Sequence, residues 1–251
     1  MEFNQNLIGA EHIIDVLRDD QEYYEGKGKQ YLSNSNIETL IKDPSKFLEP
    51  TIKTVDMLIG NYVHEIVFFN KSDIPYVDAS NRNTKIYKDA SEEYGGIMLL
   101  EKEAELGHRI RERLLQLEKA SILFDSSNVY EEPQIGDLFG NGIMWKGKAD
   151  IINTTINKVI DLKTTSNIDA FASKARLYNY DSQAWIYKKL FDLELMFFVI
   201  EKDSLRAKIV EVSEETLLKG KDKALEAEAN YISMFKTKKS DPKQFVEYGI
   251  I

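Results

Sequence analysis

The first half of the chain spaces its apolar residues as helices do. From Lys53 to Phe69 they recur every three or four positions, which predicts a helix with one buried face. Two short helices are expected between Asn36 and Leu48. Ser35 begins a capping-box spacing there, and Asp43 followed by a proline supplies a second helix start.

The next stretch of this half is polar and then helical again. Asn70 to Asn83 is irregular and polar, which predicts a surface loop. Glu92 to Leu123 is expected to form one long helix, or a helix interrupted at Gly95-Gly96. We therefore expect a helical N-terminal part over about residues 1–125.

The second half begins with strand-like runs. Ile143 to Ile152 and Val159 to Lys163 are short apolar runs on either side of the polar stretch 153–158, a pattern typical of a β-hairpin. Helical spacing returns from Ile168 to Phe191.

Two strands and a capped helix are expected to follow. The strands run from Leu195 to Glu201 and from Ala207 to Val212, and Ser213 can cap the helix. The buried stripe of that helix is expected to consist of Leu218, Leu225, Ala229 and Ile232. This order predicts a mixed α/β fold, with a central mixed sheet flanked by helices, in a single domain over residues 1–251. Its core would span about residues 126–236.

Composition and net charge exclude several classes of binding and catalytic site. The chain has 33 Lys and Arg against 42 Asp and Glu, a net charge of −9, and 43% hydrophobic residues, which is ordinary for a globular protein. The negative charge argues against coating nucleic acid by bulk attraction, but it permits a local site bridged by a cation. The chain has no cysteine, which excludes disulfides, thiolate zinc sites, iron–sulfur clusters and a cysteine nucleophile.

The chain carries no targeting signal that we recognise. Its first residues lack the basic start and apolar run of a signal peptide, and no stretch approaches the roughly 18 apolar residues of a membrane span. We expect an intracellular protein with no membrane partner.

The hairpin carries the candidate chemistry. If its loop is centred between Thr155 and Ile156, residues whose numbers sum to 311 face each other, and Asp150 lies opposite Asp161. Opposed carboxylates about 5 Å apart repel, so keeping both ionised requires a cation, and hard oxygen ligands favour Mg²⁺ or Mn²⁺. Lys163 shares the face of Asp161.

Two carboxylates and a lysine around a metal suit phosphodiester hydrolysis. The metal would acidify water, and the lysine would stabilise developing negative charge or orient that water. The alternative for an isolated D-x-K is a solvated hairpin face with an ordinary Asp–Lys pair.

These residues resemble a known signature. Asp150 followed by Asp161-x-Lys163 on the next strand resembles the motif of the PD-(D/E)XK nuclease superfamily. The runs from Gly147 to Asp150 and from Ile160 to Thr165 resemble its exodeoxyribonuclease VIII-like (RecE-type) branch, which is related to lambda exonuclease and to the RecB nuclease domain. A departure is Ala149, where the superfamily's name has proline.

Other segments resemble the same branch, in the same order. They are Leu32 to Ser35 with Asp43 to Phe47, Gly60 to Glu65, Tyr180 to Tyr187, and Phe198 to Lys202. Together the resemblance covers about residues 31–235.

The resemblance implies a restriction-endonuclease-like core and assigns site residues. The implied metal ligands are His64, Asp150, Asp161 and the Leu162 carbonyl, and the implied catalytic residues are Asp150, Asp161, Lys163 and Gln183. Gly60, one helical turn before His64, predicts a close backbone approach. Without the resemblance, a histidine packed at the edge of the helix stripe would be the simpler interpretation of His64.

Two further residues are assigned less specifically. Glu131 matches a loosely defined acidic position of the family, although Glu132 would serve equally well. Tyr187 lies one turn from Gln183 and is expected to support the helix or to join the residues that contact DNA.

A modest basic excess surrounds the proposed site. It consists of Lys163, Lys174, Arg176, Lys188 and Lys189. We expect Lys174 and Arg176 to contact DNA phosphates.

The function implied by the resemblance is a Mg²⁺-dependent exonuclease, with Mn²⁺ as a substitute, acting on linear double-stranded DNA in phage or bacterial recombination. A single-strand annealing protein would be a functional partner, and a homo-oligomer is consistent with the relatives. Two alternatives stay open: an endonuclease or single-strand nuclease in DNA repair or defence, and a catalytically silent nucleic-acid-binding module.

Overall fold

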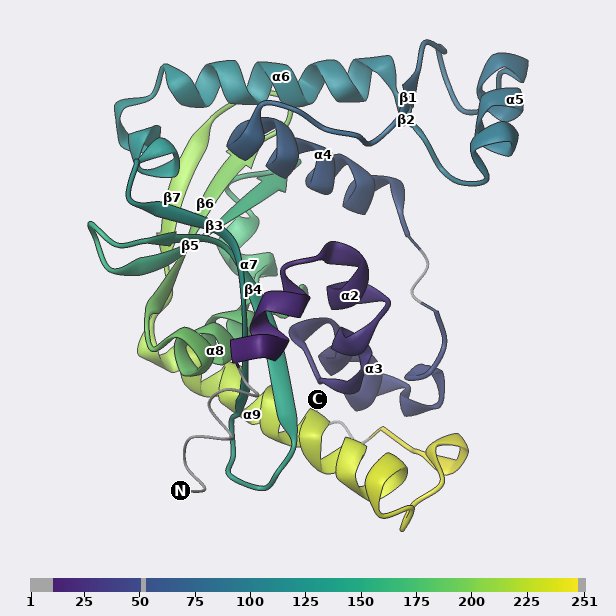
Figure 1. The fold of residues 1–251 in the computed structure, drawn as a ribbon, viewed down its shortest axis with the longest axis vertical. Helices are drawn as coiled ribbons and strands as arrows, with labels where there is room; N and C mark the ends of the chain where they lie inside the picture. Colours follow the sequence, from purple (N-terminus) through teal and green to yellow (C-terminus); the bar gives the residue numbers. More distant parts are fainter. Residues whose placement is uncertain (1–10, 51–52, 248–251) are drawn as a thin grey trace.

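A five-stranded mixed sheet forms the centre of the computed structural model, which describes residues 11–50 and 53–247 (Figure 1). Its strands are β3 (Asn128–Asp137), β4 (Met144–Asn153), β5 (Lys158–Thr165), β6 (Glu194–Glu201) and β7 (Ala207–Glu211), which lie in this order across the sheet. Neighbours are antiparallel except for β5 and β6, which are parallel. The predicted mixed α/β fold with a central mixed sheet is confirmed.

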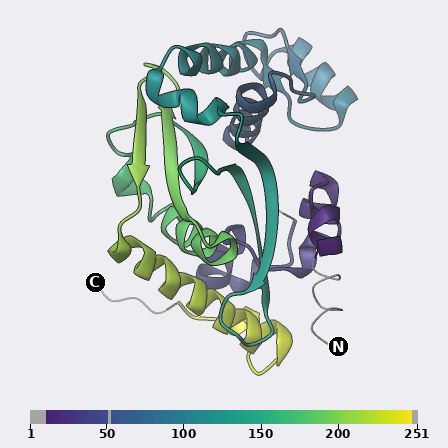
Figure 2. The ribbon, with the colours of Figure 1, turned by 60° about the vertical axis from the view of Figure 1, so that its left-hand side comes forward.

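Helices cover both faces of this sheet. Parallel strands need a crossover connection, and α8 (Tyr180–Phe191) supplies it between β5 and β6. It packs with α9 (Glu214–Tyr231) on one face, while α4 (Val55–Phe69) and α6 (Glu101–Leu115) pack together on the other. Figures 1 and 2 show α4 and α6 at one end of the molecule and α8 and α9 toward the other.

The two buried cores follow the alternation of the strands. Val159 and Phe197 belong to the cluster under α8 and α9, whereas Ile160 and Phe198 belong to the cluster under α4 and α6. Successive residues of a strand point to opposite faces, so each inner strand serves both cores.

The remaining elements are short. They are α2 (Asp20–Tyr24), α3 (Ile37–Lys42), α5 (Lys85–Tyr94), α7 (Phe171–Lys174), and the parallel pair β1 (Tyr76–Val77) and β2 (Leu99–Leu100). Residues 11–17 are helical as well, and 3₁₀ turns lie at Lys27–Gln30, Asn34–Asn36, Pro44–Lys46, Glu118–Phe124 and Pro242–Gln244, with a π-helical turn at Ile232–Lys236.

Most predicted elements form, with shifted ends. The helix predicted from Lys53 begins at Val55, and the hairpin and both C-terminal strands are present. Ser213 caps the last helix by accepting a hydrogen bond from the Thr216 amide. The capping box lies at Ser33, whose amide donates to the Asn36 side chain, and not at Ser35.

The segment expected to be one long or interrupted helix is more divided. A helix does end at Gly95, whose φ of +78° suits a glycine C-cap, but a short strand follows it before α6 begins. That strand pairs with Tyr76–Val77 inside the predicted loop. This pairing joins segments distant in sequence, which helical periodicity does not reveal.

The predicted buried stripe of α9 is wrong. Leu218 and Leu225 are 53% and 47% exposed, and the buried positions are Leu217, Gly220, Ala224, Ala227 and Glu228. The reason is a close approach between α9 and the first turn of α8, which only small side chains permit. A Cβ built on Gly220 would lie 2.1 Å from the Asp181 carbonyl oxygen.

Within the part of the chain that the structure describes, no helix combines the length and the apolar character needed to span a bilayer. The first residues, on which the expectation about targeting rests, lie outside the described ranges.

The α8–α9 contact generates a stability prediction. We expect Gly220→Ala to lower the free energy of unfolding by about 1–3 kcal/mol, because the added methyl group forces the helices apart. Gly60→Ala is the matched control: nothing lies within 4 Å of a Cβ there, so the change should stabilise α4 by about 0.5–1 kcal/mol. Urea unfolding of both variants measures these changes, and equal effects would contradict the proposed packing.

The expected close backbone approach at Gly60 is wrong, because nothing lies within 4 Å of a Cβ built there.

Candidate metal centre and active site

Acidic residues from three neighbouring strands occupy one row of the sheet. The β4–β5 pairs obey the predicted register and end at Ile151–Ile160, one position before Asp150 and Asp161. On the other side of β4, the pairs Tyr130–Ile151 and Glu132–Ala149 flank Glu131 and Asp150. At Asp150 the β3–β4 ladder is therefore interrupted, and the β4–β5 ladder ends just before it.

Glu131 has an unusual backbone at this row. Its φ is +52°, in the left-handed region that costs a residue with a side chain roughly 1–2 kcal/mol. Strain of this kind persists only where the surrounding structure holds it, and it is often associated with functional sites.

Asp150 fills the opening between β4 and β5. Its Oδ2 accepts a hydrogen bond of 2.9 Å from the Leu162 amide, which replaces a missing ladder bond. The His64 ring from α4 lies beside it, with Nδ1 3.6 Å from Asp150 Oδ2 and Nε2 2.6 Å from the Leu162 carbonyl oxygen. A carbonyl oxygen only accepts hydrogen bonds, so Nε2 carries the proton of this bond, and Nδ1 is the ring nitrogen that faces Asp150.

Asp161 is approached from the opposite side of the sheet. It is fully buried, and its Oδ1 accepts a hydrogen bond of 2.5 Å from Gln183 Nε2 on α8. The Lys163 ammonium lies 2.7 Å from its Oδ2. The cation that opposed carboxylates were expected to need is thus supplied, for Asp161, by Lys163 itself.

One cluster of potential metal ligands forms around Asp150. One ligand atom each from His64, Glu131 and Asp150 lie within 4.8 Å of one another. Two carboxylates and an imidazole fit a hard divalent cation such as Mg²⁺ or Mn²⁺, and no thiolate is present to favour a softer metal. Asp161 does not join this group, because both of its oxygens face Gln183 and Lys163.

The electrostatics of this cluster also favour a bound cation. Burial raises the pKa of Glu131 to about 7, and the charge of Asp150 adds to this. Burial and then the charge of Asp161 raise the pKa of Asp150 to about 6. Burial alone would lower the pKa of Lys163, but Asp161 and Asp150 outweigh it and raise that pKa, so this side chain remains an ammonium ion.

A comparison with known proteins agrees with this geometry. The model of a PDDEXK-like domain family of unknown function (DUF3799) matches residues 32–248. The chain belongs to this PDDEXK-like family. No curated protein matches the sequence.

One of two similar solved structures shows the same fold. A candidate exonuclease from Eubacterium rectale matches with a TM-score of 0.56 at 16% sequence identity, over 93% of this chain and 95% of the other. A phage-related exonuclease from Haemophilus somnus matches with a TM-score of 0.35 at 15% identity, over 82% of this chain and 95% of the other. At these identities, the first likeness shows the PD-(D/E)XK fold and no more.

Within this PDDEXK-like chain, Glu131 is distinguished from its neighbour. Glu131 joins the ligand cluster, whereas Glu132 is held by the Arg18 guanidinium at 2.6 Å and 3.2 Å. Register alone separates the two residues, and the sequence did not reveal it.

The proposed DNA-contacting residues differ in exposure. Lys174 and Arg176 are exposed and precede α8. Tyr187 is buried, and its hydroxyl donates a hydrogen bond of 2.7 Å to the Lys148 carbonyl oxygen. We therefore assign Tyr187 to the support of β4 and withdraw the expectation that it contacts DNA.

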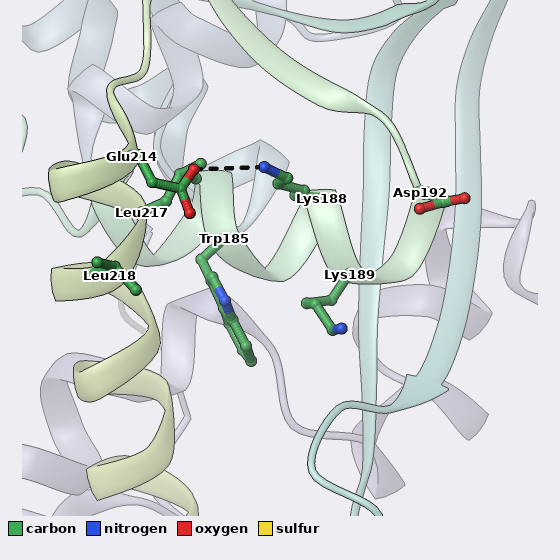
Figure 3. A pocket seen from close by; sticks show the side chains of 7 residues that line it. All are labelled: Trp185, Lys188, Lys189, Asp192, Glu214, Leu217 and Leu218. Carbon is green, nitrogen blue, oxygen red and sulfur yellow. Dashed lines mark ion pairs between the residues drawn. The ribbon is translucent and has the colours of Figure 1, made fainter.

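Lys188 and Lys189 belong to a surface pocket elsewhere on α8 (Figure 3). The pocket lies where the C-terminal part of α8 meets the start of α9, and Lys188 lies 3.6 Å from Glu214 there. Gln183, by contrast, is in the N-terminal part of α8. These two lysines are not assigned to the active site.

The N-terminal segment also packs against the strands of the site, which was not predicted from its sequence. Its helical residues and α2 contact β3 and β4 through Arg18, Asp20 and Tyr23. The available signal was the apolar spacing of Ile13, Ile14 and Leu17 before an aromatic pair.

The raised pKa values predict how stability varies with pH when no metal is bound. Between about pH 4 and 7 the folded chain holds protons on Glu131 and Asp150 that the unfolded chain has released, so stability should fall as pH rises through this window. Glu131→Gln should raise the metal-free unfolding free energy at pH 8 by on the order of 2 kcal/mol. Thermal unfolding in EDTA from pH 5 to pH 8 measures this. A flat profile in the wild type would contradict it, and Mg²⁺ should restore stability at pH 8 only when Glu131 is present.

Proposed function

We propose that this chain is a metal-dependent deoxyribonuclease that hydrolyses phosphodiester bonds, with linear double-stranded DNA degraded from an end as its substrate. The observation that carries the proposal is the convergence of His64, Glu131 and Asp150 beside the Asp161–Lys163 pair. Binding alone would not require three acidic residues and a protonated lysine in one row of a sheet.

The residues have distinct roles in this proposal. His64, Glu131 and Asp150 would hold the divalent cation, which would supply Lewis acidity toward water and the phosphate. Asp161, which the motif resemblance also assigns to the metal, would have to release Gln183 or Lys163 to join them. Lys163 remains charged and would stabilise negative charge that develops on the phosphate, or orient the attacking water. Gln183 fixes the orientation of Asp161 through its amide group.

The role of Leu162 remains a prediction. Its carbonyl oxygen already accepts a hydrogen bond from His64, and its amide donates to Asp150. Leu162 therefore aligns both proposed ligands through its backbone, which is consistent with a place at the metal. A side-chain substitution would leave these backbone atoms unchanged.

The biological setting rests on the motif resemblance. It supports a role in phage or bacterial recombination inside a cell, with a single-strand annealing protein as functional partner and a homo-oligomer as the active form. The fold shared with the candidate exonuclease from Eubacterium rectale is consistent with the nuclease assignment.

The first test is digestion of end-labelled linear duplex and of closed circular plasmid with Mg²⁺, Mn²⁺ or EDTA. We expect metal-dependent loss of the linear DNA only, and a decrease of at least about 100-fold for Asp161→Ala and for Lys163→Ala, since each removes charge at the reacting phosphate. Asp203→Ala, at an exposed acid between β6 and β7, is the control and should retain activity.

Other outcomes of this digestion would redirect the proposal. Nicking of the plasmid would favour the endonuclease alternative. DNA binding that persists in EDTA and in Asp161→Ala, without cleavage under any condition, would favour a catalytically silent binding module.

A second test concerns the path of the DNA. Changing both Lys174 and Arg176 to Glu should weaken DNA binding by at least about tenfold at low salt, because two phosphate contacts become repulsive. Changing the exposed α6 residues Lys102 and Arg109 to Glu makes the same change in net charge and serves as the control. Fluorescence anisotropy with a labelled duplex measures both, and equal weakening in the two variants would show that only total charge matters.

A further inference from the structure

The N-terminal segment, residues 11–31, is anchored beside the proposed site by charged contacts. Arg18 binds Glu132 with two hydrogen bonds, and Asp20 lies 2.6 Å from the Lys148 ammonium. Lys146 donates a hydrogen bond of 2.5 Å to the Tyr23 carbonyl oxygen. These anchors lie on β3 and β4, close in sequence to Glu131 and Asp150.

The ring of Tyr23 packs between the N-terminal segment and two lysines of β4. Tyr23 is buried, and its ring centroid lies 4.2 Å from the Lys146 ammonium and 4.6 Å from that of Lys148. Gly28 packs so closely that a Cβ there would lie 1.9 Å from the Tyr23 carbonyl oxygen. The segment is therefore seated by specific packing, and both lysines are covered by it instead of facing DNA.

This packing leaves the ring of Tyr24 exposed to solvent. Its ring contacts Tyr23 edge to face, with centroids 4.9 Å apart and planes at 78°, and it lies 5.8 Å from the Lys148 ammonium. The residue is 59% exposed. Its hydroxyl makes no hydrogen bond to any residue that the structure describes.

The position of Lys148 on β4 places Tyr24 next to the ligand cluster. Trp145 and Ala149 of β4 face the core under α8 and α9, so Lys148 and Asp150, which alternate with them, share the other face of the strand. Lys148 contacts both Asp20 and the Tyr24 ring, two residues along the strand from Asp150. An exposed, rigidly seated aromatic ring therefore borders the two acids that would hold the metal.

We propose that Tyr24 is a substrate-binding residue whose ring stacks on the base of the terminal nucleotide of the strand being cut. The proposal rests on the nuclease function proposed above and extends it to residues that precede the matched family region. Stacking on an aromatic ring tolerates any base, which suits a nuclease without sequence preference. The ammonium groups of the buried Lys146 and Lys148 pack against the Tyr23–Tyr24 pair and hold it in place.

The test compares kcat/KM on end-labelled linear duplex in Mg²⁺ for three variants. Tyr24→Ala should lower kcat/KM by about tenfold or more, chiefly through KM, whereas Tyr24→Phe should stay within about threefold of wild type because it keeps the ring. Tyr94→Ala, at a 57% exposed tyrosine on α5, is the matched control and should have no effect. The Mg²⁺ concentration at half-maximal activity should be the same in all four proteins.

An abasic substrate tests whether Tyr24 acts through the base of the terminal nucleotide. When the terminal nucleotide of each strand is replaced by an abasic analogue, wild type should lose activity at the strand end it attacks, and Tyr24→Ala should lose little more, since both changes remove one contact. An unchanged effect of Tyr24→Ala on the abasic duplex would overturn the proposal, as would loss of activity in Tyr24→Phe equal to that in Tyr24→Ala. Full activity of Tyr24→Ala would overturn it too. Absence of cleavage by wild type would instead reject the nuclease function itself.

Discussion

The structure depends on how three carboxylates are kept in one row of a β-sheet. Glu131, Asp150 and Asp161 come from adjacent strands, where like charges repel. The protein relieves this repulsion by interrupting the β3–β4 ladder at Asp150 and ending the β4–β5 ladder before it, and by pairing Asp161 with Lys163. The pKa values of Glu131 and Asp150 are raised as well. A divalent cation would complete the neutralisation, so affinity for metal follows from the same constraint that shapes the sheet.

The helices serve this row from both sides. The parallel β5–β6 pair requires a crossover, and that crossover helix brings Gln183 to Asp161 and the Tyr187 hydroxyl to the backbone of β4. On the other face, α4 brings His64 to Asp150 and to the Leu162 carbonyl. The site is thus held by elements that are far apart in sequence. Its geometry depends on the packing of α8 on α9, where Gly220 allows α9 to contact the backbone of α8 at Asp181.

The distribution of charge suits an acidic nuclease. With a net charge of −9, the chain does not attract DNA everywhere, and two of its lysines on β4 are covered by Asp20 and Tyr23. In the proposed function, attraction would be left to local features, which are Lys163 and the exposed Lys174 and Arg176 before α8. An aromatic surface at Tyr24 would add contact without adding charge.

The sequence by itself determined the mixed α/β class, the hairpin and its register, because alternation, turn composition and loop length are local properties. The resemblance to a known nuclease motif, more than spacing alone, pointed to His64 and Asp150, which the fold brings together. The tertiary structure alone decided that Glu131 and not Glu132 joins His64 and Asp150, that Leu218 and Leu225 of α9 face outward, and that residues 11–31 border the site. Each of these depends on contacts between segments that are distant in sequence, and the spacing of residues along the chain does not indicate which segments come into contact.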